Sequence, residues 1–332
     1  MTDSGQEETP YANLTPDTVL DAIEGIGYRC DGRLMALNSF ENRVYQVGAD
    51  DRFLVAKFYR PGRWSDSAII EEHQFTADLV AAEVPVVPPM TIAGQTLHPR
   101  QGHRFALFER RGGRAPELED PQVLERIGLF LGRLHRVGAE CNFAVRPRID
   151  IEHFGRIPLQ ILQQRNWIPA ELQAAWAAVT ERALEGIADA FERAGAVQSI
   201  RLHGDCHAGN ILWTDQGPHF VDLDDARGGP AVQDLWMLLS GDAASQALQL
   251  GHVLRGYERF RDFDRRELQL IEALRTLRYL HYTAWIASRW SDPAFPAAFP
   301  WFGTNRDWQE RILALREQLA AMAEPPLEVW SD

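Results

Sequence analysis

The sequence predicts an α+β protein with two lobes: a small N-terminal lobe with an antiparallel sheet and one main helix, and a larger, mostly helical C-terminal lobe. Three observations support this fold class. Residues 43–47 and 53–57 are rich in strand-forming side chains and flank a polar turn at residues 48–51, which is typical of a hairpin. After residue 120, apolar side chains recur at helical spacing instead. A chain of 332 residues is also long enough to bury two separate cores.

The N-terminal lobe is predicted to cover residues 1–107. A first helix should begin at Thr15, a favourable N-cap, because Pro16 suits the first helical position. After the hairpin, residues 65–82 predict the main helix of the lobe, with apolar side chains on one face.

The end of the lobe contains proline. Residues 84–89 should be extended, because a residue that precedes proline avoids the helical conformation. Two further strands are expected near residues 90–93 and 105–108. Residues 108–113 are then interpreted as the hinge, and residues 114–332 as the C-terminal lobe.

The C-terminal lobe should open with a helix that begins after Asp120 and ends at Gly138. Gly128 and Gly132 lie one turn apart on it, which predicts close packing against another helix. His135, on the same helix, is interpreted as structural.

A second long helix is predicted between Pro169 and Gly195, with one apolar face. Aromatic side chains are frequent in residues 285–308. They are interpreted as core packing, and the alternative is a cage for a quaternary ammonium group.

Composition excludes several classes of protein. The content is 45% hydrophobic and 24% charged, as in ordinary globular proteins, and the net charge of −13 argues against a nucleic-acid surface. No run approaches the ~20 apolar residues of a membrane helix, and the first ten residues do not resemble a signal peptide. The cysteines Cys30, Cys141 and Cys206 are too few and too dispersed for a disulfide framework. We expect a cytoplasmic monomer that binds neither nucleic acid nor a membrane.

The stretch from residue 202 to residue 226 concentrates the chemistry. Asp205 is followed by Asn210, and Asp222 comes after two short apolar runs joined by a turn. Such a hairpin would return Asp222 beside Asn210, where their oxygens suit magnesium. Asp205 would orient and deprotonate a hydroxyl. The pattern predicts phosphoryl transfer from a metal-bound nucleotide, with Asp205 and Asp222 as the catalytic acids.

Two other interpretations of these residues were considered. Cys206 and His207 lie close to His203, but a zinc site needs a second pair of ligands at suitable spacing, which this sequence lacks. A nucleotide-binding scaffold without catalysis is the other alternative. The combination of Asp205, Asn210 and Asp222 argues against it.

The motif HGDxxxxN, followed by a strand that ends in aspartate, resembles the kinase-like phosphotransferases, which include aminoglycoside phosphotransferases, choline kinases and type II homoserine kinases. Protein kinases carry HRDxxxxN and DFG in the equivalent places. The longer strings LHGDCHAGNILW, FVDLDDARGGPAVQDLWMLLSGD and LNSFENRVYQV resemble most closely the bacterial stress response kinases of this family.

This resemblance implies a bilobal, protein-kinase-like fold and the cofactors ATP and Mg²⁺. It implies that Lys57 contacts the α- and β-phosphates and that Glu72, or the adjacent Glu71, fixes the lysine ammonium. Residues 38–42 take the place of a glycine-rich phosphate loop although they contain no glycine, and Ser39 is the expected nucleotide contact.

The resemblance also implies a serine/threonine protein kinase that autophosphorylates, with protein substrates whose identity the sequence does not give. The alternative acceptors are choline, homoserine or an aminoglycoside. Asp234 corresponds to the family's acid that binds the backbone of the catalytic loop. Only eleven residues separate Asp222 from Asp234, and Gly204 replaces the arginine of HRD, so we expect no switch by activation-loop phosphorylation.

Overall fold

The N-terminal part of the computed structural model, which describes residues 10–329, is an antiparallel sheet of five strands in the order β1-β2-β3-β5-β4. The predicted hairpin is formed by β2 and β3. Asp50 and Asp51 join these strands with φ angles of 48° and 60°, the left-handed conformation that tight hairpin turns require. The strands are β1 (Cys30–Ala36), β2 (Arg43–Ala49), β3 (Arg52–Tyr59), β4 (His98–Arg100) and β5 (His103–Glu109).

Two helices accompany this sheet, α1 (Pro16–Glu24) and α2 (Asp66–Ala81). Both begin as predicted, because the side chains of Thr15 and Ser65 accept hydrogen bonds from the first turn of their helices. α1 packs into the core of the sheet, whereas α2 packs Ile69 against the sheet and contributes Phe75 and Leu79 to the large core of the C-terminal part. α2 therefore joins the two parts.

The prediction of a strand at residues 90–93 is wrong. The amide of Met90 does bond to the carbonyl of Leu107, but Ile92 pairs only with Gln95. The chain turns between them through two residues with positive φ, which ends the extended pairing. The edge strand is β4 instead.

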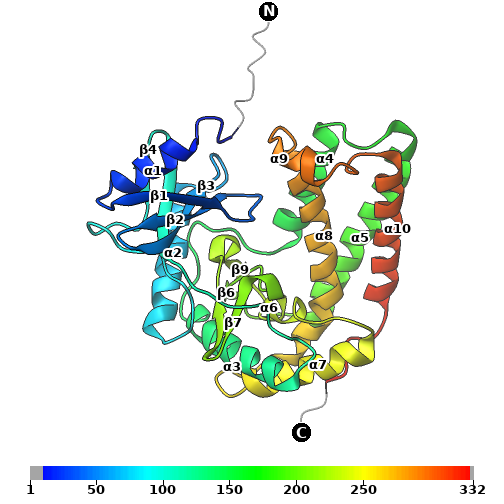
Figure 1. Cartoon of the computed structure of the whole chain (residues 1–332). Helices are drawn as coiled ribbons and strands as arrows, with labels where there is room; N and C mark the ends of the chain where they lie inside the picture. Colours follow the sequence, from blue (N-terminus) through cyan, green and yellow to red (C-terminus); the bar gives the residue numbers. More distant parts are fainter. Residues whose placement is uncertain (1–9, 330–332) are drawn as a thin grey trace, which may run out of the picture.

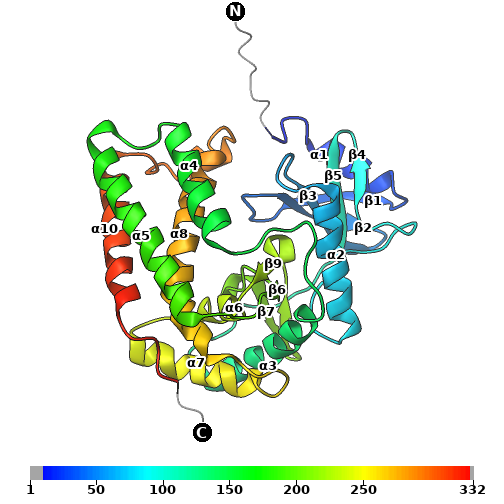
Figure 2. The same ribbon diagram turned by 180° about the vertical axis from the view of Figure 1, so that it is seen from behind.

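The C-terminal part is mainly helical. Figures 1 and 2 show α5, α8 and α10 side by side on the side away from the sheet, with α3 and α7 beneath the centre of the molecule. Its helices are α3 (Pro121–Gly138), α4 (Ile157–Gln164), α5 (Gln173–Ala194), α6 (Val232–Trp236), α7 (Ala243–Tyr257), α8 (Ile271–Ser288), α9 (Ala294–Ala298) and α10 (Asn305–Ala323). Two short antiparallel pairs lie at its centre: β6 (Ile200–Leu202) with β9 (Arg227–Gly229), and β7 (Ile211–Thr214) with β8 (Gly217–Phe220).

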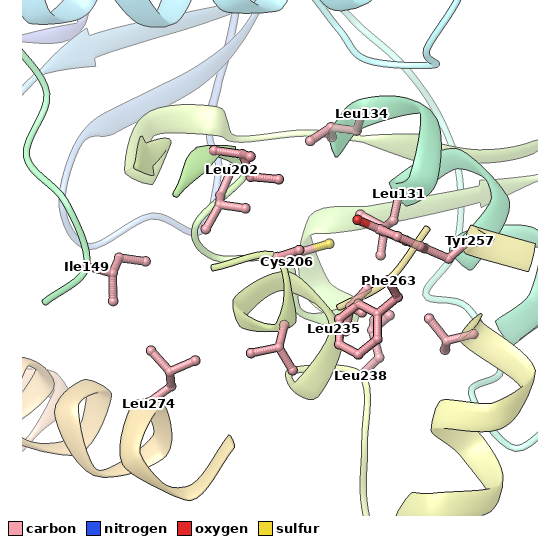
Figure 3. Close-up of a cluster of buried hydrophobic side chains, with 14 of the residues drawn as sticks. Leu131, Leu134, Ile149, Leu202, Cys206, Leu235, Leu238, Tyr257, Phe263 and Leu274 are labelled. Carbon is pink, nitrogen blue, oxygen red and sulfur yellow. The ribbon is translucent and has the colours of Figure 1, made fainter. Parts of the chain in front are cut away.

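The large core lies directly behind the central strand pairs. Figure 3 shows Leu202 and Cys206 among side chains that come from α3, α6 and α7. Cys206 is fully buried there, so the residue after Asp205 fixes this segment to the core. The predicted long helix is α5, which ends before Gly195 as expected.

A second core fills the space between α5, α8 and α10. Phe295, Phe302 and Trp308 are buried in it, which agrees with the core-packing interpretation of these aromatic residues. Among residues 10–329, no helix is long and apolar enough to cross a membrane.

The helices α3 and α7 touch through their backbones. A Cβ atom on Gly128 would lie 1.9 Å from the carbonyl oxygen of Val253, and one on Gly132 would lie 2.4 Å from that of Tyr257. The close packing predicted from these glycines is confirmed.

We predict that Gly128→Ala destabilises the protein by about 2–3 kcal/mol, because the added methyl group forces α3 away from α7. Denaturant unfolding measures this change. Gly112→Ala is the matched control, since a Cβ atom there meets nothing within 4 Å and should leave stability unchanged. Equal stability of the two variants would contradict this account of the contact.

Candidate active site

The loop from residue 203 to residue 210 connects β6 to β7 and is held by one buried carboxylate. Asp234, on α6, accepts hydrogen bonds from the amides of His203 (2.8 Å) and Gly204 (2.9 Å). His135 of α3 lies 3.0 Å from the same carboxylate. The backbone-binding role expected for Asp234 is confirmed, and so is the structural role of His135.

Gly204 has a steric reason to be glycine. Its φ is +83°, and a Cβ atom would lie 2.1 Å from the carbonyl oxygen of Asp225. No larger side chain fits this position, so the arginine of HRD-type loops is excluded.

The side chain of Asp205 is anionic. Its Oδ1 lies 2.7 Å from Nη1 of Arg278, and its Oδ2 lies 3.5 Å from Nε2 of His207 and 3.4 Å from Nδ2 of Asn210. Burial acts to raise the pKa of Asp205, but the contacts with His207 and Arg278 hold it below its usual value. Asp205 is therefore ionised at neutral pH, as an acceptor of a hydroxyl proton must be.

The hairpin of β7 and β8 returns Asp222 next to Asn210, as the sequence predicted. The amide of Val221 donates to the carbonyl of Asn210 at 3.0 Å. Asp222 then adopts the left-handed conformation, with φ 60° and ψ 61°, where the chain leaves the hairpin. Both side chains line one cavity of about 350 Å³.

Lys57, on β3, reaches into the same cavity from the sheet. Its Nζ lies 2.8 Å from Oδ1 of Asp222 and 3.3 Å from Oδ1 of Asp224. Burial by itself would lower the pKa of Lys57, but the two carboxylates hold it well above its usual value. The ammonium is charged although it is buried.

The expected ion pair between Lys57 and Glu72 is not formed, and this expectation is corrected. Glu72 lines the cavity, but Oε2 of its carboxylate lies 3.2 Å from Nη2 of Arg146, while Asp222 and Asp224 take the ammonium. Burial raises the pKa of Glu72 to about 7 despite the nearby Lys57 and Arg146.

The neighbouring Glu71 has a different task. Its carboxylate accepts hydrogen bonds from three consecutive amides, those of Ala144, Val145 and Arg146. It thereby holds the segment that carries Arg146 against α2. Of the two glutamates left open by the sequence, only Glu72 lines the cavity.

The sequence did not predict a group of ion pairs and hydrogen bonds near Lys57. Asp224 bonds to Asn42 and Arg63, and Asp225 pairs with Arg63 and Arg227. The run LDDAR was visible in the sequence, but only partners far along the chain reveal what its acids do. These contacts join the sheet to the central strand pairs.

The loop at residues 38–42 is anchored to the C-terminal part by Glu41. Its carboxylate lies 3.0 Å from Nη2 of Arg289, and it also accepts from the indole of Trp285 and pairs with Arg60. Ser39 lines the cavity. The ion pairs of Glu41, rather than glycine, shape this loop.

The cavity has a mixed lining. Its apolar side chains are suited to a flat ring, and its polar end is formed by Lys57, Asn210 and Asp222, which lie close together. The apolar lining consists of Leu37, Val44, Val55, Val87, Phe108, Leu212, Val221 and Leu223.

A divalent cation fits the polar end if a ligand contributes further oxygens. Asn210 and Asp222 present an amide and a carboxylate, the hard oxygen donors that magnesium prefers. Within residues 10–329, no group of three or more His, Cys, Asp or Glu side chains could hold a metal by itself. Magnesium is usually bound through one or two carboxylates and substrate phosphates, which agrees with this sparse set.

Known proteins are similar in sequence to this chain. A model of the phosphotransferase enzyme family matches residues 34–271. The chain belongs to the phosphotransferase enzyme family. Stress response kinase A of Salmonella choleraesuis (strain SC-B67) is 46% identical to it over 320 residues, which cover 96% of this chain and 97% of that protein. The protein named serine/threonine protein kinase RdoA of Salmonella typhimurium shows the same identity and coverage. This phosphotransferase is thus a homologue of the stress response kinases.

Solved structures share the fold. Amicoumacin kinase hAmiN, in complex with AMP-PNP, Ca²⁺ and Ami, has a TM-score of 0.70 at 16% identity and covers 91% of either chain. The microcompartment-associated aminopropanol kinase has a TM-score of 0.68 at 19% identity, over 93% of this chain and 96% of that one. The predicted α+β, kinase-like fold is confirmed.

We predict that Glu41→Ala weakens nucleotide binding about tenfold, equivalent to about 1.4 kcal/mol. The loop at residues 38–42 would lose its anchor on α8, so binding would have to order it. Calorimetric titration with a nucleotide measures the dissociation constant. Asp31→Ala is the control, because its ion pair with Arg33 is exposed and should contribute little. A dissociation constant unchanged by Glu41→Ala would contradict this role.

Proposed function

We propose that this phosphotransferase is a serine/threonine protein kinase that uses ATP and Mg²⁺. The observation that carries the proposal is the ionised carboxylate of Asp205, held next to Asn210, which lines a cavity together with Lys57 and Asp222. The choice of a protein acceptor is supported by the relative named serine/threonine protein kinase, at 46% identity over 96% of this chain.

In this proposal the apolar lining of the cavity binds the adenine ring. Residues 108–113 act as the hinge between an N-terminal lobe, residues 1–107, and a C-terminal lobe, residues 114–332. Lys57 binds the phosphates, and Ser39 donates to them from the loop.

Glu72 lines the same cavity without touching Lys57. Its role in the proposal is electrostatic: its ionised form raises the pKa of Lys57, although its own pKa of about 7 leaves it only partly ionised at neutral pH. Asn210 and Asp222 hold the cation, which neutralises negative charge on the phosphates when it is bound.

The acceptor hydroxyl donates a hydrogen bond to Asp205. As its oxygen forms a bond to the γ-phosphorus, the bond from that phosphorus to the β,γ-bridging oxygen breaks and ADP leaves. Asp205 takes the hydroxyl proton. A carboxylate with a pKa below its usual value is a weak base, so Asp205 contributes mainly by orienting the hydroxyl.

A protein-kinase activation switch does not fit this chain. The segment between Asp222 and Asp234 contains no serine, threonine or tyrosine, so nothing in it can be phosphorylated on a hydroxyl. Much of it is buried in β9 and α6. We therefore propose that the enzyme is active without phosphorylation of this segment.

We predict that Asp205→Ala lowers turnover about 10²-fold or more while ATP binding stays nearly normal, because only the acceptor loses its partner. Asp222→Ala should abolish magnesium-dependent nucleotide binding. Steady-state kinetics and calorimetry separate these effects. Asp215→Ala, in the exposed turn of the same hairpin, is the control and should behave as wild type. Full turnover by Asp205→Ala would contradict the catalytic role of Asp205 and favour the alternative that the protein is a nucleotide-binding scaffold.

The acceptor is tested by incubating the purified protein with labelled ATP and magnesium. Parallel reactions contain no acceptor, a generic protein substrate, choline, homoserine or an aminoglycoside. We expect label on the protein substrate and on the enzyme itself. Label on a small molecule alone would contradict the protein-kinase proposal while preserving phosphotransfer.

A further inference from the structure

One face of α8 contacts both loops of the active site. Arg278 lies against Asp205, whereas Trp285 and Arg289 lie against Glu41. Seven residues, or about two helical turns, separate Arg278 from Trp285, so both lie on the same side of α8, and Arg289 follows directly after its last residue. At 1.5 Å per residue, Arg278 and Trp285 are about 10 Å apart along the helix axis. This face therefore runs alongside both loops of the active site.

The acids around the site are each paired with a cation. Four of these cations pair with Asp222, Asp224, Asp225 and Glu72. They are Lys57, Arg63, Arg227 and Arg146, and their side chains are 11% exposed or less. Arg278 differs, because 37% of its side chain is exposed. Of these five cations, only Arg278 is substantially accessible to a molecule that enters from solvent.

The two oxygens of Asp205 have different surroundings. Oδ1 is buried and has no partner with hydrogen-bond geometry among the described residues, and its one short contact there is the ion pair with Arg278 at 2.7 Å. The side chain is nevertheless 22% exposed, so this exposure does not come from Oδ1. An entering hydroxyl can reach only Oδ2, whose contacts with His207 and Asn210 are 3.5 and 3.4 Å long.

Such long contacts restrain a carboxylate weakly, whereas a guanidinium charge 2.7 Å from Oδ1 attracts it strongly in a partly buried site. The rotation of the Asp205 side chain is therefore set mainly by Arg278. Without this cation, Oδ1 would be a buried charge with no counter-charge, and the carboxylate would turn to regain solvent.

Resting on the proposed role of Asp205, we propose that Arg278 is a positioning residue for phosphoryl transfer: it holds Oδ1 of Asp205 and thereby presents Oδ2 to the acceptor hydroxyl. Asp205 comes from the catalytic loop and Arg278 from the helical wall opposite. The orientation of the acid thus depends on the position of α8.

The test compares Arg278→Met and Arg278→Lys with wild type. Methionine keeps much of the length of the side chain but removes its charge. We expect Arg278→Met to lower kcat about 10²-fold, as misplacement of a reacting group does, with the nucleotide dissociation constant within twofold of wild type. Arg278→Lys should recover part of kcat, because an ammonium can still pair with Oδ1.

Arg275→Met is the matched control. Arg275 lies one turn earlier on α8 and pairs with Glu272 at 2.7 Å, away from the catalytic loop. It should retain the kcat of wild type. Melting temperatures of all variants are compared, because a purely structural role of Arg278 would lower stability and weaken nucleotide binding together with kcat.

A kcat of Arg278→Met within twofold of wild type would overturn the inference, as would a parallel loss of kcat, nucleotide affinity and melting temperature. Asp205→Ala is measured alongside. If it turns over normally, the proposed function fails; if it is inactive while Arg278→Met is fully active, only the positioning role fails.

Discussion

The need to neutralise buried carboxylates shapes this molecule. Several acids converge where the sheet meets the central strand pairs, and buried anions are tolerated only when cations and hydrogen bonds surround them. The cations arrive from both parts of the chain: Lys57 and Arg63 from the sheet side, Arg146 and Arg227 from the other. The ion pairs that neutralise the acids of the site therefore also fix the position of the two parts relative to each other.

Close backbone contacts supply the rigidity that this charge cluster needs. Asp234 can hold two amides of the catalytic loop because His135 fixes its carboxylate from α3, and α3 is fixed in turn by its glycine contacts with α7. Gly204 lets the loop pass against Asp225. Core packing behind the loop thus determines where Asp205 stands, although no core side chain takes part in chemistry.

Local signals predicted much of this fold, and distant partners explain most of the errors. A few consecutive residues determine the helix caps at Thr15 and Ser65 and the hairpin that leads to Asp222. By contrast, the ion pair of Glu72 with Arg146 joins positions 74 residues apart, and that of Asp205 with Arg278 comes from a helix much later in the chain. Periodicity carries no information about such pairs. The sequence therefore brought Ser39, Lys57, Glu72, Asn210 and Asp222 to one site, and all five line the cavity, but it did not predict which cation each acid would pair with.

The loop at residues 38–42, which we propose contacts the nucleotide, is shaped without glycine. A glycine-rich loop gains close approach and freedom of movement, whereas this loop gains fixed geometry from the ion pairs of Glu41 with Arg60 and Arg289. Trp285, which contacts Glu41, and the cation on Asp205 belong to one helix, α8, and Arg289 follows directly after it, so a shift of that helix would move the loop at residues 38–42 and Asp205 together. Because α8 also packs against α4 and α5, a displacement of these helices would be transmitted to both. The helical side of the C-terminal part is thus mechanically continuous with the loop at residues 38–42.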